Sequence, residues 1–353
     1  MIASTDKTNV LSHFVGLLFV IMAFSDVLQS REVIVTGALL SIGAFILCFP
    51  IKDKNRYSES MIFILFLIIT TITNLFFTKN NFGGSVILLG SLFLSFTYFH
   101  LNKKTLTLGI FAGYLVTLLF ISYHLFFLET SANLIYEGLS RNHAGFAIIF
   151  WTIFLLFHLK VTYNRFPIIL PFITLIIAYF LFGRTSIVVS ALTLLVVFFY
   201  KFKNRKTRII AILVFLISNY YLLLKFGDLL TEETNFGEGL ETSRWKLWRI
   251  YMETIDSINF FTGVDVTKIK EYNIYGGNPH NAFLKFHSRT GIGGLVFVAL
   301  LFVSLLNYLK TKQYYIFWLL MLLILRAFFD SDILIGNFDF IFFIVTFYWI
   351  KKY

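Results

Sequence analysis

Long apolar segments follow one another through this chain and decide what it can fold into. A membrane-spanning helix needs roughly 20 apolar residues, and only 14% of the 353 residues are charged, against about 25% in soluble domains. The predicted spans are Leu11–Leu28, Val33–Pro50, Met61–Phe77, Ser85–His100, Leu106–Leu128, Ala144–His158, Pro167–Phe182, Ser186–Tyr200, Ile209–Leu224, Gly291–Leu309, Tyr315–Phe329 and Ile333–Ile350. We therefore predict an all-α polytopic membrane protein of about 12 transmembrane helices, a single integral membrane domain over residues 1–353.

Several other features narrow the class of protein. Cys48 is the single cysteine and lies in a predicted span, so neither a disulfide framework nor a thiolate metal site is expected. The first apolar stretch lacks a small-residue cleavage site, which predicts a retained helix. The net charge of +11 is spread over short loops, so nucleic acid is not an expected partner. Without a nucleotide loop or a metal-binding motif, no cofactor and no metal are predicted.

The basic residues set the expected topology. With the N-terminus in the cytoplasm, alternate loops hold more than half of the Lys and Arg residues, among them Lys103, Lys104, Lys160, Lys201, Lys310 and Lys312. This bias is typical of cytoplasmic loops. The alternation persists to the C-terminus, which favours an even number of spans and cytoplasmic termini.

One long polar insert, residues 225–290, is expected outside the cytoplasm and contains short helices. Thr242 or Ser243 is a candidate cap for its first helix. An apolar stripe suited to the membrane interface follows at helical spacing, formed by Trp245, Trp248, Met252 and Ile255. His280 is expected to open a second short helix after Pro279.

Arginines on the outer side are candidate anion ligands, because arginine binds phosphate oxygens bidentately. Arg184 follows a tight turn, and Thr185 or Ser186 is expected to cap the next helix, whose N-terminus favours anions. The alternative is an interfacial arginine that reaches the lipid headgroups. Arg244 opens the first insert helix, and its alternative role is a salt bridge to Glu241.

His280 is a candidate general base, because the unperturbed pKa of histidine is about 6.5. A solvated loop histidine is the alternative. Asn281 beside it offers a side-chain amide, and His287 is either a substrate contact or a structural residue. His143, in a second outer helix start with a small residue at Gly145, is expected to be a helix-end group.

The remaining candidate substrate contacts are also arginines on the outer side. They are Arg141, Arg249, Arg289 and Arg326. Asp330 and Asp332 follow Arg326, and they either form a local charge cluster, orient that arginine or contact sugar hydroxyls.

Three local patterns, in the order in which they occur along the chain, resemble those of the bacterial O-antigen and capsular repeat-unit polymerase (Wzy) and O-antigen ligase superfamily. They are Gly183-Arg184-Thr185-Ser186 at a mid-chain helix start, Ser243-Arg244-Trp245 in a large outer loop, and Gly277-Asn278-Pro279-His280-Asn281 followed by Arg289-Thr290-Gly291-Ile292-Gly293-Gly294. The span pattern resembles that superfamily over nearly the whole length. The resemblance implies a GT-C-like membrane fold with one large extracytoplasmic loop.

The resemblance implies a metal-independent glycosyltransferase of the bacterial inner membrane. Its donor would be an oligosaccharide on undecaprenyl diphosphate, and a polymerase would use a second lipid-linked unit as acceptor, with a chain-length regulator as a further partner. Arg184 and Arg244 would bind the diphosphate and His280 would activate the acceptor hydroxyl. The alternatives are an O-antigen ligase acting on lipid A-core and a lipid-linked oligosaccharide flippase, which would show internal repeats and broken helices.

Overall fold

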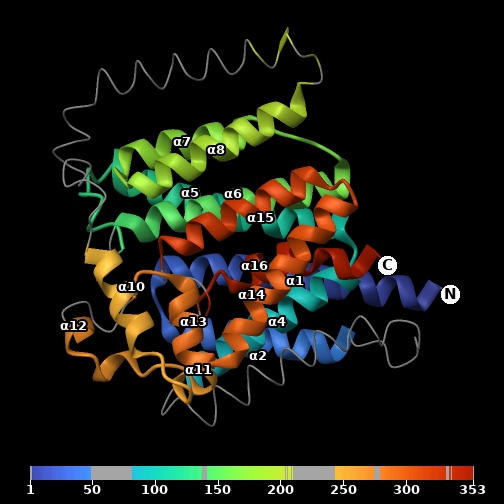
Figure 1. Ribbon diagram of the computed structural model, residues 1–353. Helices are drawn as coiled ribbons and strands as arrows, with labels where there is room; N and C mark the ends of the chain where they lie inside the picture. Colours follow the sequence, from blue (N-terminus) through green and yellow to red (C-terminus); the bar gives the residue numbers. More distant parts are fainter. Residues whose placement is uncertain are drawn as a thin grey trace.

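The computed structural model describes residues 2–48, 82–136, 141–202, 243–273, 279–330 and 336–352, with residues 204, 206, 207, 209 and 334. Every regular element in this part of the chain is helical (Figure 1). The elements are α1 (Ile2–Leu28), α2 (Arg31–Cys48), α4 (Phe82–His100), α5 (Lys103–Phe126), α6 (Arg141–Tyr163), α7 (Ile169–Phe180), α8 (Arg184–Lys201), α10 (Ser243–Thr254), α11 (Asn259–Thr262), η3 (Val266–Lys268), α12 (Lys270–Asn273), α13 (Ala282–Thr290), α14 (Ile292–Lys310), α15 (Tyr314–Phe328), α16 (Asp339–Phe347) and η4 (Tyr348–Lys352). The all-α prediction is confirmed for the described residues.

Six of the described helices are long and apolar enough to cross a membrane, namely α1, α2, α5, α6, α8 and α14. Shorter apolar helices occupy four other predicted spans: α4, α7, α15 and the α16–η4 segment. The predicted span Met61–Phe77 lies outside the described residues. The predicted span Ile209–Leu224 also lies outside them, except for its first residue. A protein with several membrane-crossing helices follows from these lengths and compositions.

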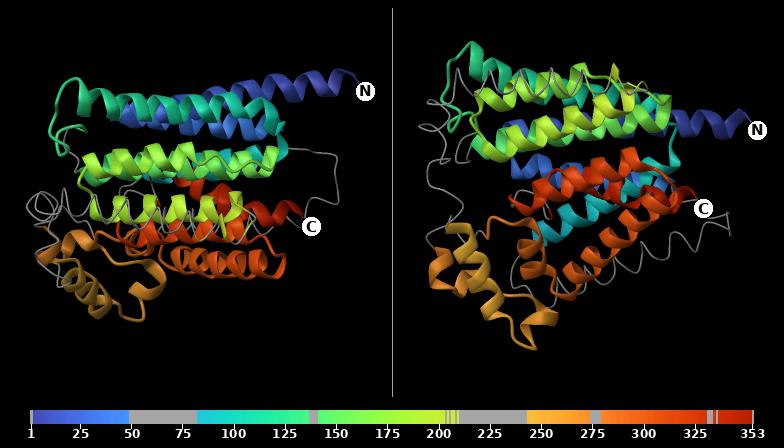
Figure 2. Two further views of the ribbon diagram at one scale, coloured as in Figure 1. Left: turned by 90° about the horizontal axis from the view of Figure 1, so that it is seen from above. Right: turned by 45° about the horizontal axis from the view of Figure 1, so that its top comes forward.

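The long helices run side by side in one bundle, with the two chain ends at one end of it (Figures 1 and 2). Helices α10 and α12 of the insert lie at the opposite end. Helix α6 is central: every side chain from His143 to His158 is buried, and α6 packs against α5, α7, α8, α15 and α16. A helix that is apolar on all sides is expected at such a position.

The outer helices instead expose large apolar side chains. Leu108 is 74% exposed, Leu119 64% and Phe302 62%. Water would penalise so much exposed apolar surface, whereas lipid chains would cover it. The exterior of the bundle therefore fits a bilayer.

Some predicted helix boundaries were wrong. Helix α8 begins at Arg184 with Gly183 as its N-cap and without a side-chain cap bond, so neither Thr185 nor Ser186 caps it. The last predicted span begins late, at Asp339, because the Asp339 carboxylate accepts the Leu334 and Gly336 amides at 2.7 and 3.0 Å and stabilises a turn there.

The insert has its own small apolar core, which changes the predicted interfacial stripe. Leu247, Trp248 and Tyr251 of α10 are buried together with Val264 and Tyr272. Of the four predicted stripe residues, Trp248 is buried in this core, and Ile255, just after the end of α10, packs against it. Trp245 (51%) and Met252 (62%) are exposed. The interfacial contact stays a prediction for these two exposed residues.

Candidate functional site

The C-terminal end of α15 carries a buried ion pair. Arg326 is 1% exposed, and its Nη2 lies 2.8 Å from Oδ2 of Asp330, one helical turn away. The same Nη2 donates to the carbonyl oxygen of Asn142 at 2.8 Å, and the guanidinium lies 5.8 Å from the ring centre of Phe146. Arg326 thus joins α15 to the first turn of α6. The Arg326 guanidinium is therefore buried, and Asp330 orients it. Orienting Arg326 is one of the roles predicted for Asp330.

The turn between α7 and α8 brings Arg184 to the same region. Phe182 has a left-handed φ of 51°, an unusual conformation for a bulky residue. A Cβ on Gly145 of α6 would lie only 2.2 Å from Oγ of Ser186. The first turn of α8 therefore packs directly against α6 at Gly145. Arg184 is half-buried at this turn.

Arg244, in the first turn of α10, docks on the end of α15. Its Nη1 donates to the carbonyl oxygen of Phe329 at 3.1 Å. One turn along α10, the Trp248 ring packs edge-on against Phe328, with ring centres 4.9 Å apart. Glu241, the predicted alternative partner, lies outside the described residues.

Arg184 and Arg326 both lie close enough to Arg244 to act on its charge. Burial lowers the pKa of Arg244, attraction to Asp330 opposes that effect, and repulsion by Arg326 and Arg184 adds to it. Arginine nevertheless stays charged in proteins. Arg184, Arg244 and Arg326 therefore come from distant parts of the sequence to one region. Among the described carboxylates, Asp330 is the one that acts on Arg244 there.

The His280 loop is attached to the same helix. Trp248 Nε1 donates to the Pro279 carbonyl oxygen at 2.9 Å, so the residue before His280 is held one turn from Arg244. His280 is half-buried and has a φ of 50°. Residues held in this region of φ/ψ space are frequent at functional sites.

Helix α13 begins two residues after His280, at Ala282, so His280 does not open it as expected. Asn281 is the N-cap, and its side chain accepts the amides of Phe283 at 3.0 Å and Leu284 at 3.1 Å. Asn281 is 3% exposed. The Asn281 amide oxygen therefore caps the helix and fixes the backbone beside His280.

His287 has a structural environment. Its Nδ1 lies 2.7 Å from the Tyr251 hydroxyl, and its Nε2 lies 3.1 Å from the Phe260 carbonyl oxygen. The carbonyl can only accept, so Nε2 carries the hydrogen and Nδ1 accepts from the tyrosine. Burial lowers the pKa of His287. Both ring nitrogens hold the insert together, which favours the structural alternative.

The other candidate arginines are dispersed. Arg289 is half-buried; burial lowers its pKa, and attraction to the buried Asp339 opposes this. Arg249 is exposed on α10. Arg141 is the first residue of α6, with its side chain outside the described set, and Asp332 lies outside the described residues.

A buried group that the sequence interpretation missed contacts the first turn of α6, to which Arg326 also bonds. Asp26, near the end of α1, is fully buried; its Oδ1 lies 2.8 Å from His143 Nε2, and its Oδ2 accepts from the Tyr136 hydroxyl at 3.1 Å. His143 directly follows Asn142, whose carbonyl receives the Arg326 bond. The available signal was an acidic residue inside a predicted span, where charge is costly and usually has a partner.

Within the described chain, no group of three or more His, Cys, Asp or Glu is placed to hold a metal ion. Comparisons with protein-family models, curated proteins and solved structures give no match to this chain.

Proposed function

We propose that this protein is a membrane glycosyltransferase that polymerises undecaprenyl-diphosphate-linked oligosaccharide units on the outer face of a bacterial cytoplasmic membrane, with a GT-C-like fold of about 12 spans. The observation that carries the proposal is the convergence of three arginines: Arg244 bonds the end of α15, the helix that carries Arg326, and both Arg326 and Arg184 lie close enough to act on its charge. Such a cluster is costly to assemble unless an anion occupies it.

The charge of the cluster fits a diphosphate diester. The Arg326–Asp330 pair is neutral as a unit. Arg184 and Arg244 then contribute one positive charge each, and a diphosphate diester carries one negative charge on each phosphate. Arginines that match the developing charge of the leaving diphosphate can take the part that a metal ion has elsewhere.

His280 is the proposed base. Trp248 ties the His280 loop to the helix that carries Arg244, so acceptor activation and leaving-group binding are held by one rigid element. In the proposed step, neutral His280 takes the proton of an acceptor sugar hydroxyl, the oxygen attacks the anomeric carbon, and the bond to the diphosphate breaks. A positioned general base contributes about 10²–10⁴-fold to such a rate.

The proposal is tested by complementation of a strain that lacks this chain, with glycan read on gels and membrane level measured by immunoblot. Arg184→Ala, Arg244→Ala and His280→Ala are expected to leave single repeat units and no long chains. Arg249→Ala is the matched control for Arg244, because it removes an exposed arginine from the same helix. His124→Ala is the control for His280, because His124 is another half-buried histidine, in the last turn of α5, where its Nδ1 lies 3.3 Å from the Thr130 hydroxyl. Both controls should restore the full ladder.

The outcomes separate the alternative functions. Long chains that accumulate on the lipid carrier without attachment to lipid A-core would indicate a ligase. Units retained on the cytoplasmic face in the deletion strain would indicate a flippase. A normal ladder from all three well-expressed variants would refute the assignment of these residues.

A further inference from the structure

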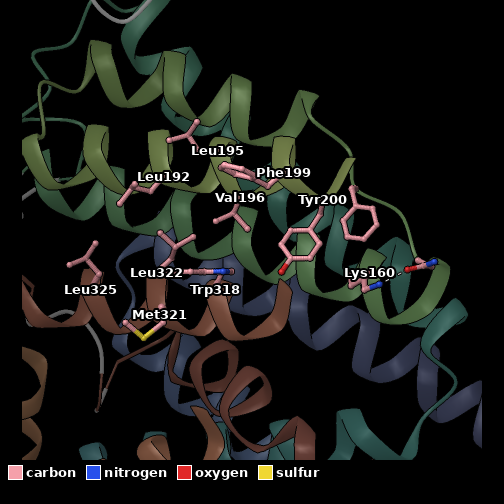
Figure 3. A pocket seen from close by; sticks show the side chains of 12 residues that line it. Lys160, Leu192, Leu195, Val196, Phe199, Tyr200, Trp318, Met321, Leu322 and Leu325 are labelled. Carbon is pink, nitrogen blue, oxygen red and sulfur yellow. Dashed lines mark hydrogen bonds between the residues drawn. The ribbon is translucent and has the colours of Figure 1, made fainter. Parts of the chain in front are cut away.

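A cavity of about 880 Å³ lies between α8 and α15 (Figure 3). Its wall is apolar over most of its length and includes Leu195 and Val196 of α8 with Met321 and Leu322 of α15. A cavity with such a wall does not hold ordered water, which needs several polar partners. Its occupant must therefore be largely hydrocarbon.

The cavity is continuous with the exterior that fits a bilayer. Three of its apolar lining residues are also surface residues: Leu192 is 37% exposed, Phe199 45% and Trp318 48%. A lipid chain can therefore enter sideways between the two helices without crossing the protein core.

The polar groups of the lining lie at one end. Lys160 and Asn164 are there, with the lysine Nζ donating to the asparagine Oδ1 and lying 4.8 Å from the ring centre of Phe166. Arg184 begins α8, whereas the lining residues of that helix run from Leu192 to Tyr200. Along α8 the cavity therefore begins about two turns beyond Arg184, and on α15 its end opposite Lys160 reaches Leu325, next to Arg326.

This polarity selects the kind of lipid. We propose that the α8–α15 cavity binds an acyl chain of an anionic phospholipid from the leaflet at the lysine end, with the lipid phosphate against Lys160 and Asn164. Among the described residues of the lining there is no carboxylate, so their charge complements an anionic headgroup. Cytoplasmic leaflets are rich in anionic lipids, and the basic loops predict that this end faces the cytoplasm.

The tail of a polyprenyl donor fits less well. Its diphosphate would lie at the arginine cluster, so the tail would enter from the opposite end and place its apolar tip against Lys160. The phospholipid instead places phosphate at the lysine and hydrocarbon among the leucines. The lipid site does not depend on the proposed glycosyl transfer.

Trp318 supplies a local probe, because bromine on a lipid chain quenches tryptophan fluorescence at contact. The full-length protein is placed in phosphatidylcholine nanodiscs that contain increasing small fractions of phosphatidylglycerol with brominated chains. The signal of Trp318→Phe is subtracted to isolate Trp318. We expect saturable quenching by brominated phosphatidylglycerol and only proportional quenching by brominated phosphatidylcholine.

Variants of the lining test each part of the site. Lys160→Ala should raise the half-saturating fraction about fivefold, since one lysine near a lipid phosphate contributes about 1 kcal/mol. Val196→Phe should abolish saturation by filling the cavity. Val188→Phe is the control, because Val188 is an exposed residue of α8 outside the lining, and it should leave the titration unchanged.

Three results would overturn the proposal: equal quenching by the two brominated lipids, an unchanged titration for Lys160→Ala, or displacement by undecaprenyl phosphate at a lower fraction than by unlabelled phosphatidylglycerol. The Lys160 result does not depend on tolerance of the larger Val196 side chain, because Lys160→Ala adds no volume to the bundle.

Discussion

Replacing Gly145 by alanine tests the closest helix approach in the candidate site. The new Cβ would lie 2.2 Å from Ser186 Oγ and 2.8 Å from Ser186 Cβ, and Ser186 is fully buried. Overpacking of this kind costs about 1–3 kcal/mol, while alanine in place of a helical glycine contributes about 0.5–1 kcal/mol of stability. We expect a net loss of about 1–2 kcal/mol.

Substitutions of Ser186 vary how severe the overlap created by Gly145→Ala is. Ser186→Ala removes the oxygen but leaves its Cβ within 2.8 Å of the new group, and Ser186→Gly removes both atoms. Gly145→Ala should therefore be most harmful with serine at 186, less harmful with alanine, and neutral or stabilising with glycine. The coupling between the two positions should be about 1–3 kcal/mol, within the range measured for contacting residues.

The assay is thermal unfolding of the purified protein in detergent, where each kcal/mol shifts Tm by about 2 °C in a chain of this size. The glycan ladder supplies a second measurement, because Arg184 is two residues from Ser186 and moves with the first turn of α8. We expect the ladder to shorten in Gly145→Ala and to recover with Ser186→Gly. Equal Tm changes in all three backgrounds would refute the close contact between α6 and α8.

Three further changes test buried groups. Asp330→Asn should lower stability by about 3–5 kcal/mol, because it leaves the Arg326 guanidinium buried beside a neutral group; Arg326→Met with Asp330→Asn should recover part of the loss, and no recovery would contradict a buried ion pair. Burial holds the pKa of His287 below its unfolded value of 6.5. The stabilisation by neutral His287 is therefore complete above pH 6.5 and is lost as the pH falls through the lowered pKa. The drop in Tm from pH 7.5 to 5 should be smaller in His287→Gln than in the unsubstituted protein, and an equal drop would contradict a neutral buried histidine. Asp26→Asn should lower Tm and shorten the ladder together, because it removes the carboxylate that holds His143; a ladder unchanged at lower Tm would limit this pair to folding.

The sequence predicts most helices well because lipid exposure and helix length impose a simple apolar pattern. The cap of α8 was not predictable in the same way. Ser186 is a good local capping residue, but its hydroxyl packs against Gly145, and nothing near it in the sequence indicates that contact. Likewise, the Asp339 carboxylate accepts the backbone amides of Leu334 and Gly336. The sequence alone does not identify these partners.

The candidate site was likewise predictable from the sequence only in part. Arg184 and Arg244 were identifiable because each opens a helix next to a polar turn. Their convergence with Arg326 was not, since it depends on how α8, α10 and α15 pack. The Asp26–His143 contact joins residues 117 positions apart, so a sequence pattern shows only that each is unusual.

Burial divides the site into two layers with different expected phenotypes. Arg184 and Arg244 are half-buried and can reach a bound anion, so their loss should affect glycan synthesis more than folding. Arg326 and Asp26 are buried behind them and hold the first turn of α6, so their loss should reduce stability and synthesis together. A short ladder at normal Tm is therefore the phenotype that separates an anion ligand from the residues that position it, and an arginine cluster serving only stability would not produce it.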